Sequence, residues 1–218
     1  MAYGMFLGCN LGPDILVKNN KVQGSMYNDL WINDSDWGIE PNLVQKKRTA
    51  FTISGNDLQS LPGVTSLLLI DSRRIDHPDE GFPQLFDVRE NSFSIQTGGM
   101  AINGSNSMDA KFTNNEFTGN GSTGIYLEGD SATAILGENA LISGNDFSGA
   151  SYTDADVYLG FMTKNCTVNG TATDKVIDHG TNNILNGVTA QQGRLNYILN
   201  RFPNKAIEIK NRMMNNKQ

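Results

Sequence analysis

The feature that most constrains this chain is a short pattern that returns five times: an apolar residue, two variable residues, an Asn, a variable residue and a second apolar residue. Successive copies of the Asn are separated by 24 to 36 residues. The copies span residues 17–22, 53–58, 88–93, 112–117 and 142–147. A repeat of about 20 to 50 residues indicates supersecondary units that stack on one another, so the repeat decides the fold.

Each repeat also carries a second apolar segment with the two-residue alternation of a strand. These segments are residues 30–32, 67–69, 100–102, 125–127 and 157–159. Gly, Asn, Asp and Ser recur at short intervals between residues 15 and 170, where each would destabilise a helix. We therefore expect at least two short strands per repeat, joined by tight turns.

The Asn residues suit the corners of such a stack. Stacked repeats would place them in one column, about 4.8 Å apart, which is the spacing of neighbouring strands. Asn tolerates the left-handed backbone region, and its amide can bond to the Asn of the next repeat as a ladder. The sequence thus predicts an all-β fold, a parallel solenoid whose interior is filled by aligned Val, Ile, Leu and Phe.

Several segments resemble the rungs of right-handed parallel β-helix proteins of the pectin-lyase-like superfamily. They are the NNxF segment at 114–117, SGNDF at 143–147, GIYLEG at 124–129, and residues 165–170 and 176–183. The resemblance covers about residues 3–188 and implies a right-handed parallel β-helix. Members are mostly polysaccharide lyases, glycoside hydrolases, phage tailspikes and microbial surface proteins. More narrowly, the chain resembles β-helix modules of archaeal disaggregatase-type surface proteins, which act on the cell-wall polysaccharide of methanogens.

The two ends depart from that family pattern in different ways. Residues 3–8 match the second strand of a rung, whereas family members usually begin with a capping helix. An uncapped rung exposes strand edges, so we expect a fragment of a longer chain, or self-association at the N-terminal rung. Apolar residues at helical spacing near the other end predict a basic helical cap over residues 190–218, after a β-helix domain at 1–189. These residues are Leu195, Ile198, Leu199 and Phe202.

Charge and composition exclude several classes of function. The formal net charge is -6, and the acidic side chains lie mainly in residues 1–189, which disfavours nucleic-acid binding. No apolar run is long enough to span a membrane, and no signal peptide is visible, so an extracellular or cell-surface location rests on the resemblance alone. Cys9 and Cys166 form no CxxC pair and are expected to be small buried hydrophobes.

A column of aromatic side chains is the first candidate site. If the flanking apolar residues of the second strands point inward, the residues between them point outward. These outward residues are Phe6, Trp31, Leu68, Ala101, Tyr126 and Tyr158. Aromatic side chains stack on sugars, so the column predicts a polysaccharide-binding strip. The alternative is that another domain or subunit covers the strip.

Polar residues next to this strip are candidates for substrate contact and hydrolysis. Asn33, Asn103 and Glu128 are expected in the next outward column, with Asp71 and Asp130 at the strand ends. Hydrolysis requires two carboxyl groups flanking the glycosidic bond, and Glu128 paired with Asp130 or Asp71 is the candidate pair. The competing interpretation is that these are solvated turn residues.

The charged segment 71–80 is a candidate for elimination chemistry. Arg73 or Arg74 could clamp a uronate carboxylate, and His77 could act as the base, although Arg and Asp pairs often only order a loop. No cofactor and no metal site are predicted. Calcium at Asp154 and Asp156 would need carbonyls and waters from neighbouring rungs. His179 is expected to be a turn residue.

The function predicted from these features is recognition of an extracellular polysaccharide. Hydrolase or lyase activity is left open. The alternative is a non-catalytic structural or adhesion segment of a microbial surface protein, and a third option is an oligomeric fibre of the phage type.

Overall fold

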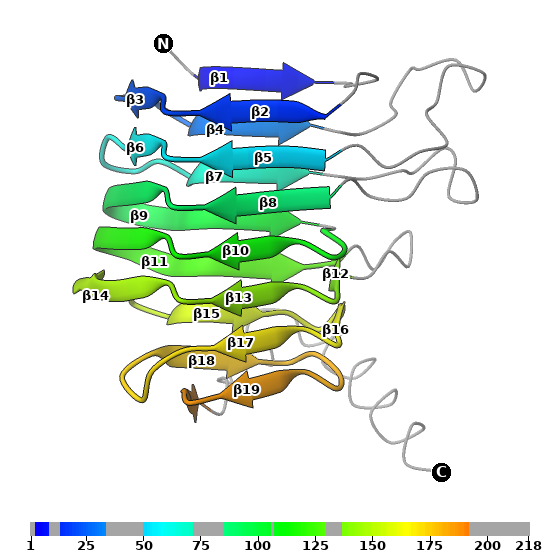
Figure 1. The fold of residues 1–218 in the computed structure, drawn as a ribbon. Helices are drawn as coiled ribbons and strands as arrows, with labels where there is room; N and C mark the ends of the chain where they lie inside the picture. The colour runs from blue at the N-terminus through cyan, green and yellow to red at the C-terminus, as the bar shows by residue number, and fades with distance from the viewer. Residues whose placement is uncertain are drawn as a thin grey trace, which may run out of the picture.

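The structure is a computed structural model and describes residues 3–8, 14–33, 50–71, 85–105, 107–129 and 137–191. These residues form β-strands stacked in a column, and the strand pairs are parallel (Figure 1). The described ranges contain no helix. The all-β, parallel architecture predicted from the repeat is therefore confirmed.

Two long sheets run along the column. The first contains β1 (Tyr3–Gly8), β4 (Asn28–Asn33), β7 (Ser66–Asp71), β9 (Ser92–Ser105), β11 (Glu116–Glu128), β15 (Ala155–Leu159), β18 (Lys175–Asp178) and β20 (Thr189–Gln191), in this order. The second contains β2 (Ile15–Lys18), β5 (Ala50–Ser54), β8 (Leu85–Arg89), β10 (Lys111–Thr113), β13 (Leu141–Ser143), β17 (Thr167–Asn169) and β19 (Ile184–Asn186), also in chain order.

Shorter strands lie between these sheets. They are β3 (Lys21–Gln23), β6 (Asp57–Gln59) and β14 (Asp146–Ala150), which pair with each other or with the first residues of β9 and β11, and the pair β12 (Gly137–Glu138) and β16 (Thr163–Lys164). Along the chain, each repeat contributes a strand to the second sheet, then a short strand in most repeats, and then a strand to the first sheet. Every strand pairs with its counterpart one repeat away, which is compatible with a solenoid.

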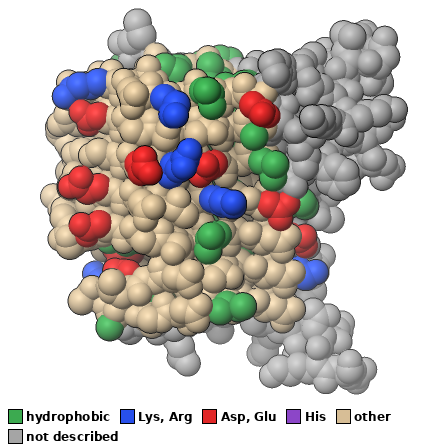
Figure 2. Space-filling view, in the orientation of Figure 1, with side chains coloured by type: hydrophobic (Ala, Val, Ile, Leu, Met, Phe, Trp, Pro, Cys, Tyr) green, Lys and Arg blue, Asp and Glu red, His purple; other side chains and the backbone are tan. Residues whose placement is uncertain are grey.

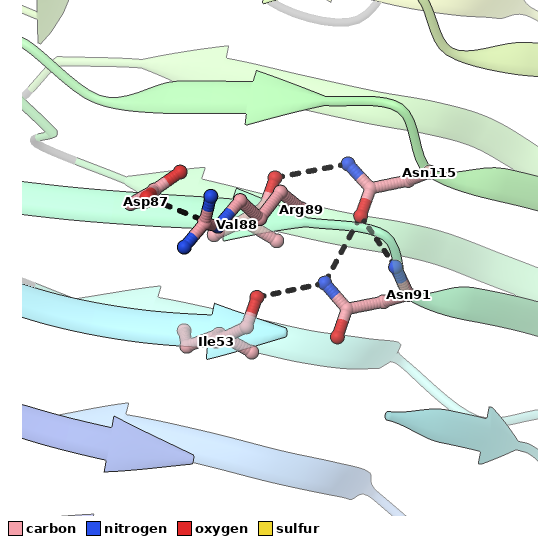
Figure 3. A network of polar contacts seen from close by, with 6 residues as sticks. All are labelled: Ile53, Asp87, Val88, Arg89, Asn91 and Asn115. Atoms are coloured by element: carbon pink, nitrogen blue, oxygen red, sulfur yellow. Dashed lines mark hydrogen bonds and ion pairs between the residues drawn. The ribbon is translucent and has the colours of Figure 1, made fainter. Parts of the chain in front are cut away.

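The predicted Asn ladder is present at one corner of the column. Asn91 Oδ1 accepts hydrogen bonds from the backbone N–H and from Nδ2 of Asn56, at 3.0 and 2.8 Å. Asn115 Oδ1 accepts the same two bonds from Asn91, at 3.1 and 3.0 Å (Figure 3). Asn20 and Asn145 extend the ladder in the two directions. The ladder therefore joins five successive repeats through paired amide bonds.

Each ladder amide also bonds the main chain of the preceding repeat. Nδ2 of Asn91 donates to the carbonyl of Ile53, and Nδ2 of Asn115 donates to the carbonyl of Val88, at 2.9 and 3.0 Å (Figure 3). Asn91 and Asn115 are buried, so these bonds satisfy polar groups that have no access to water. Each inner ladder Asn consequently contacts three repeats, its own and one on either side.

The left-handed residue at this corner is not the ladder Asn but the residue before it. Asn19, Glu90 and Asn114 have φ of 57, 57 and 53°, and Gly55 and Gly144 occupy the same place in the other repeats. The residue with left-handed backbone geometry therefore lies one position before the ladder Asn, whereas the sequence pattern predicts this geometry for the Asn itself. This leaves the ladder Asn to direct its amide along the column.

The core between the sheets consists of in-register apolar side chains. Phe93 stacks on Phe117, and Phe117 stacks on Phe147, with ring centroids 5.2 and 4.6 Å apart. Phe51 and Phe86 make a second stack at 5.2 Å. Ring positions that recur one repeat apart bury large apolar areas, so the core reinforces the register of the strands.

The predicted C-terminal cap receives no support from the structure. Residues 189–191 form β20, so the segment assigned to the cap begins as a strand. Residues 192–218 lie outside the described residues. At the other end, β1 pairs with β4 as the second strand of a repeat, as expected from residues 3–8.

A carboxyl group is buried near the N-terminal end of the first sheet. Asp29 on β4 is 0% exposed, and no described residue donates a hydrogen bond of normal geometry to either of its oxygens. Burial raises the pKa of Asp29 to about 6, although the nearby Ser25 and Gln59 offset part of this rise. The folded protein therefore holds this proton more tightly than the unfolded chain does.

Asp29 should make stability fall as the pH rises. Its contribution is fully present below the ordinary pKa of 3.8 and is lost as the pH passes the folded value of about 6. The difference corresponds to about 3 kcal/mol. Urea unfolding of the wild type and Asp29→Asn between pH 4 and 7 should give a smaller loss of stability in the variant. Curves that fall in parallel would contradict this assignment.

Candidate functional site

The candidate site is a column of side chains on the first sheet, which we call the aromatic column. Its members occupy one register position on seven successive strands. They are Phe6, Trp31, Leu69, Asn103, Tyr126, Tyr158 and Ile177. Phe6 is exposed and the other members are half-buried. Parallel pairing therefore brings Trp31, Tyr126 and Tyr158 onto one line, as the sequence predicted.

Two of the residues predicted for this column do not belong to it. Leu68 and Ala101 are both 0% exposed and belong to the core, and Leu69 and Asn103 take their places. Leu68 lies in an unbroken apolar run, where no alternation indicates which residues face inward. Ala101 lies two residues too early along β9, at a buried position. Asn103, expected in the neighbouring column, is therefore a member of the aromatic column itself.

The rings of the column form two groups. Phe6 and Trp31 meet edge to face, with centroids 4.9 Å apart. Tyr126 and Tyr158 stack at 5.1 Å with an angle of 21° between their planes. The second group continues into His179, which meets the edge of Tyr158 at 5.5 Å and stacks on Phe161 at 4.6 Å. The sequence predicts only a turn residue at His179. It gives no sign of this ring contact, because Phe161 lies in a turn and not in one of the repeated strands.

Stacking decides which ring surfaces a ligand could reach. One face of Tyr126 is taken by Tyr158, and its other face is directed towards Asn103. Burial, with help from the charge of Glu128, raises the pKa of Tyr126 above its usual range. Its hydroxyl, which is protonated at neutral pH even with an ordinary pKa, is therefore still harder to ionise. The column therefore presents ring edges, a protonated tyrosyl hydroxyl and the Asn103 amide rather than a row of flat faces.

Glu128 is occupied by contacts with the backbone. Its carboxylate oxygens accept hydrogen bonds from the N–H groups of Gly129, Phe161 and Met162, at 2.9, 3.1 and 2.7 Å. The last two donors belong to the turn that follows β15. Glu128 therefore holds this turn, and with it Phe161, beside the aromatic column.

Strand register also places the other predicted polar residues. Asn33, Asp71, Ser105 and Glu128 share one position on successive strands, so Asn33 and Asp71 lie in the column of Glu128. Asp71 and Glu128 are two strands apart, or about 10 Å between backbones. Arg73, His77 and Asp130 lie outside the described residues, and their proposed roles stay predictions.

The remaining sequence candidates show no cluster of ligands. Asp154 is exposed, while Asp156 is buried and accepts a 2.7 Å hydrogen bond from the backbone N–H of Lys175. Cys166 is buried, as predicted, and burial raises the pKa of its thiol. Within the described ranges, no group of three His, Cys, Asp or Glu side chains could hold a metal ion.

The described strands of the second sheet carry no comparable column of rings. Figure 2 shows basic, acidic and apolar side chains scattered over its outer face. Arg89 and Asp87 on β8 pair across 3.3 Å on this face. Mixed charges of this kind are typical of a solvated surface, so the first sheet is the better candidate for a site.

Comparisons with models of known protein families, with curated proteins and with solved structures found no match to this chain. In the part of the chain that is described, no helix has the length and hydropathy of a membrane span.

Replacing Glu128 tests whether its role is structural. In Glu128→Gln, one oxygen becomes an amide nitrogen that cannot accept the backbone N–H bonds, so we expect a loss of about 2 kcal/mol in unfolding free energy. Thermal and urea unfolding would measure it. Glu116→Gln, on an exposed position of β11, is the matched control. Equal stability of the two variants would refute the structural role.

Proposed function

We propose that this chain is a right-handed parallel β-helix module that recognises an extended polysaccharide along the aromatic column. Support for the β-helix comes from the parallel pairing of every strand with its counterpart and from the Asn ladder through five repeats. The resemblance of residues 3–188 to pectin-lyase-like rungs favours the same architecture. It also favours a location outside the cell.

The observation that carries the proposed function is the alignment of ring and amide side chains at one register position. Neighbouring members are about 4.8 Å apart, so a chain molecule lying along the column would meet a new side chain at each strand. The ring edge and hydroxyl of Tyr126 can contact a sugar, and the Asn103 amide beside them can bond a sugar hydroxyl. The Leu69 and Asn103 positions between Trp31 and Tyr126 carry no ring.

Recognition is a better-supported function than hydrolysis. A general acid must present a proton to the leaving oxygen, whereas both oxygens of Glu128 accept backbone N–H groups. Polysaccharide hydrolase or lyase activity would then depend on Asp71, Asp130, Arg73 and His77. We therefore propose binding as the function and leave cleavage as a separate prediction.

One observation favours a second function, that of a structural or adhesion segment. The faces of Tyr158, His179 and Phe161 are used in packing against one another, as in a protein interior. In that case the column is the contact surface for another domain or subunit, and its exposed end, Phe6, would be covered.

Replacing column residues separates these two functions. Trp31→Ala and Tyr126→Ala should each weaken binding to a responsive polysaccharide about tenfold, because one ring contact is lost. Affinity electrophoresis in acidic and neutral polysaccharides would measure binding, and thermal unfolding would measure stability. Leu16→Ala, at an exposed position on β2 of the opposite sheet, is the control and should change neither.

Two outcomes would count against recognition. Failure of every polysaccharide to retard the wild type would refute it directly. Loss of stability or assembly in the variants, without any effect on sugar binding, would favour the structural function.

A further inference from the structure

Several Asn residues of this chain stand two residues before a Ser or Thr, with no Pro between them. They are Asn33, Asn103, Asn120, Asn165 and Asn169. In secreted proteins, this pattern marks an Asn whose side-chain amide can accept an oligosaccharide. Such a glycan is bulky and hydrated, so the folded chain can carry it only on its surface. The side chain of Asn33 lies outside the described residues, and the structure decides among the other four.

Asn120 and Asn165 can accommodate a glycan. Both are exposed, and neither side-chain amide has a hydrogen-bond partner in the part of the chain that the structure describes. Asn120 lies on β11 between Gly119 and Gly121, where the register with β9 shifts. Asn165 lies in the turn between β16 and β17, with φ of 56°. A glycan on either Asn would therefore break no hydrogen bond among the described residues.

Asn103 and Asn169 are less suitable. Asn103 is half-buried in the aromatic column, between Leu69 and Tyr126 in the register of the first sheet. A glycan there would cover the column that we propose as the polysaccharide site. Asn169 is also half-buried, and its Oδ1 accepts a hydrogen bond from Nδ2 of Asn186 at 2.8 Å. Burial and existing contacts thus set these two positions apart from Asn120 and Asn165.

The fold holds the hydroxyl residues of both suitable patterns in place. Oγ of Ser122 on β11 donates a hydrogen bond to the carbonyl of Gly99, at 3.0 Å. The backbone N–H of Thr167 on β17 donates to the carbonyl of Ala140, at 2.8 Å. An enzyme that must grasp the Asn and the hydroxyl residue together therefore acts before these strands pair. The folded structure then only has to leave room for the product.

We propose that Asn120 and Asn165 are acceptor sites for an N-linked oligosaccharide. The donor is an oligosaccharide carried on a polyprenyl phosphate or diphosphate. A bond forms between Nδ2 of the Asn and the anomeric carbon of the first sugar, and the bond from that carbon to the phosphate oxygen breaks. The lipid phosphate leaves with the electron pair, and Nδ2 gives up one proton. This inference rests on the location outside the cell that the proposed function includes.

Both proposed acceptor sites lie away from the aromatic column. Asn120 precedes Tyr126 by six residues on β11. Asn165 directly precedes β17, which belongs to the second sheet. Glycans at these positions would cover turns and a strand irregularity and would leave the column itself unmodified. Glycosylation and polysaccharide recognition are therefore compatible in one molecule.

Secretion of the full chain from a eukaryotic host, behind a host signal peptide, tests the proposal. Enzymatic glycan release in heavy-oxygen water converts each glycosylated Asn into a labelled Asp, which peptide mass spectrometry locates. We expect the label at Asn120 and Asn165 of the folded, secreted chain and not at Asn103. A sample without the glycosidase controls for spontaneous deamidation. Absence of the label from either Asn120 or Asn165 would overturn the assignment of that site, and equal labelling of Asn103 would overturn the structural selection.

Variants at the hydroxyl residues test each site without changing its Asn. Ser122→Ala and Thr167→Ala destroy the acceptor pattern, whereas Ser122→Thr and Thr167→Ser keep it and are the matched controls. Each Ala variant should lose the glycan of its own Asn and keep the other one. Each control should keep both glycans. A glycan that persists in the Ala variant of its own pattern would contradict the assignment.

The same samples separate this inference from the proposed function. Affinity electrophoresis would compare the glycosylated chain with the enzymatically deglycosylated chain. A polysaccharide that binds the aromatic column should retard both forms equally. Weaker retardation of the glycosylated form would contradict the placement of the glycans away from the column. Glycans at Asn120 and Asn165 without retardation by any polysaccharide would refute recognition and support the acceptor sites.

Discussion

The side-chain amide ladder is the interaction on which the rest of this structure depends. Consecutive ladder Asn residues are separated by 36, 35, 24 and 30 residues, yet the same pair of bonds to Oδ1 forms at every step. A ladder position that bonds its neighbours directly lets the intervening segments vary in length without shifting the strands. Register at the corner is then carried along each repeat to the first sheet, where it aligns the aromatic column.

Much of this arrangement follows from residues that are close together in the sequence. The five Asn positions indicated a ladder, and the alternating segments that follow them indicated strands, because both signals repeat with one local pattern. Which side chains of a strand face the core could be predicted where apolar and polar residues alternate, as around Tyr126. It could not be read at 67–70, where four apolar residues follow one another and the inward phase is undefined.

Other features required contacts between distant parts of the chain. The donors to Glu128 lie in the turn after the next strand, so an acidic residue at a strand end looked like a catalytic candidate. Asp29 lies among other polar residues in the sequence, so its burial could not be read from the local pattern. The contact of His179 with Phe161 likewise needs the turn to close. Sequence pattern predicted the scaffold better than the site because the scaffold repeats and the site does not.

The repeats stack in one register and thereby align the aromatic column. Pairs of Cys residues introduced into the column test this register directly by oxidative crosslinking. Tyr126→Cys combined with Tyr158→Cys, on neighbouring strands, should form a disulfide readily, because adjacent strands lie within disulfide reach. Tyr126→Cys combined with Ile177→Cys, two strands apart, should stay reduced. Efficient crosslinking of the second pair, or none of the first, would contradict the register and the column built on it.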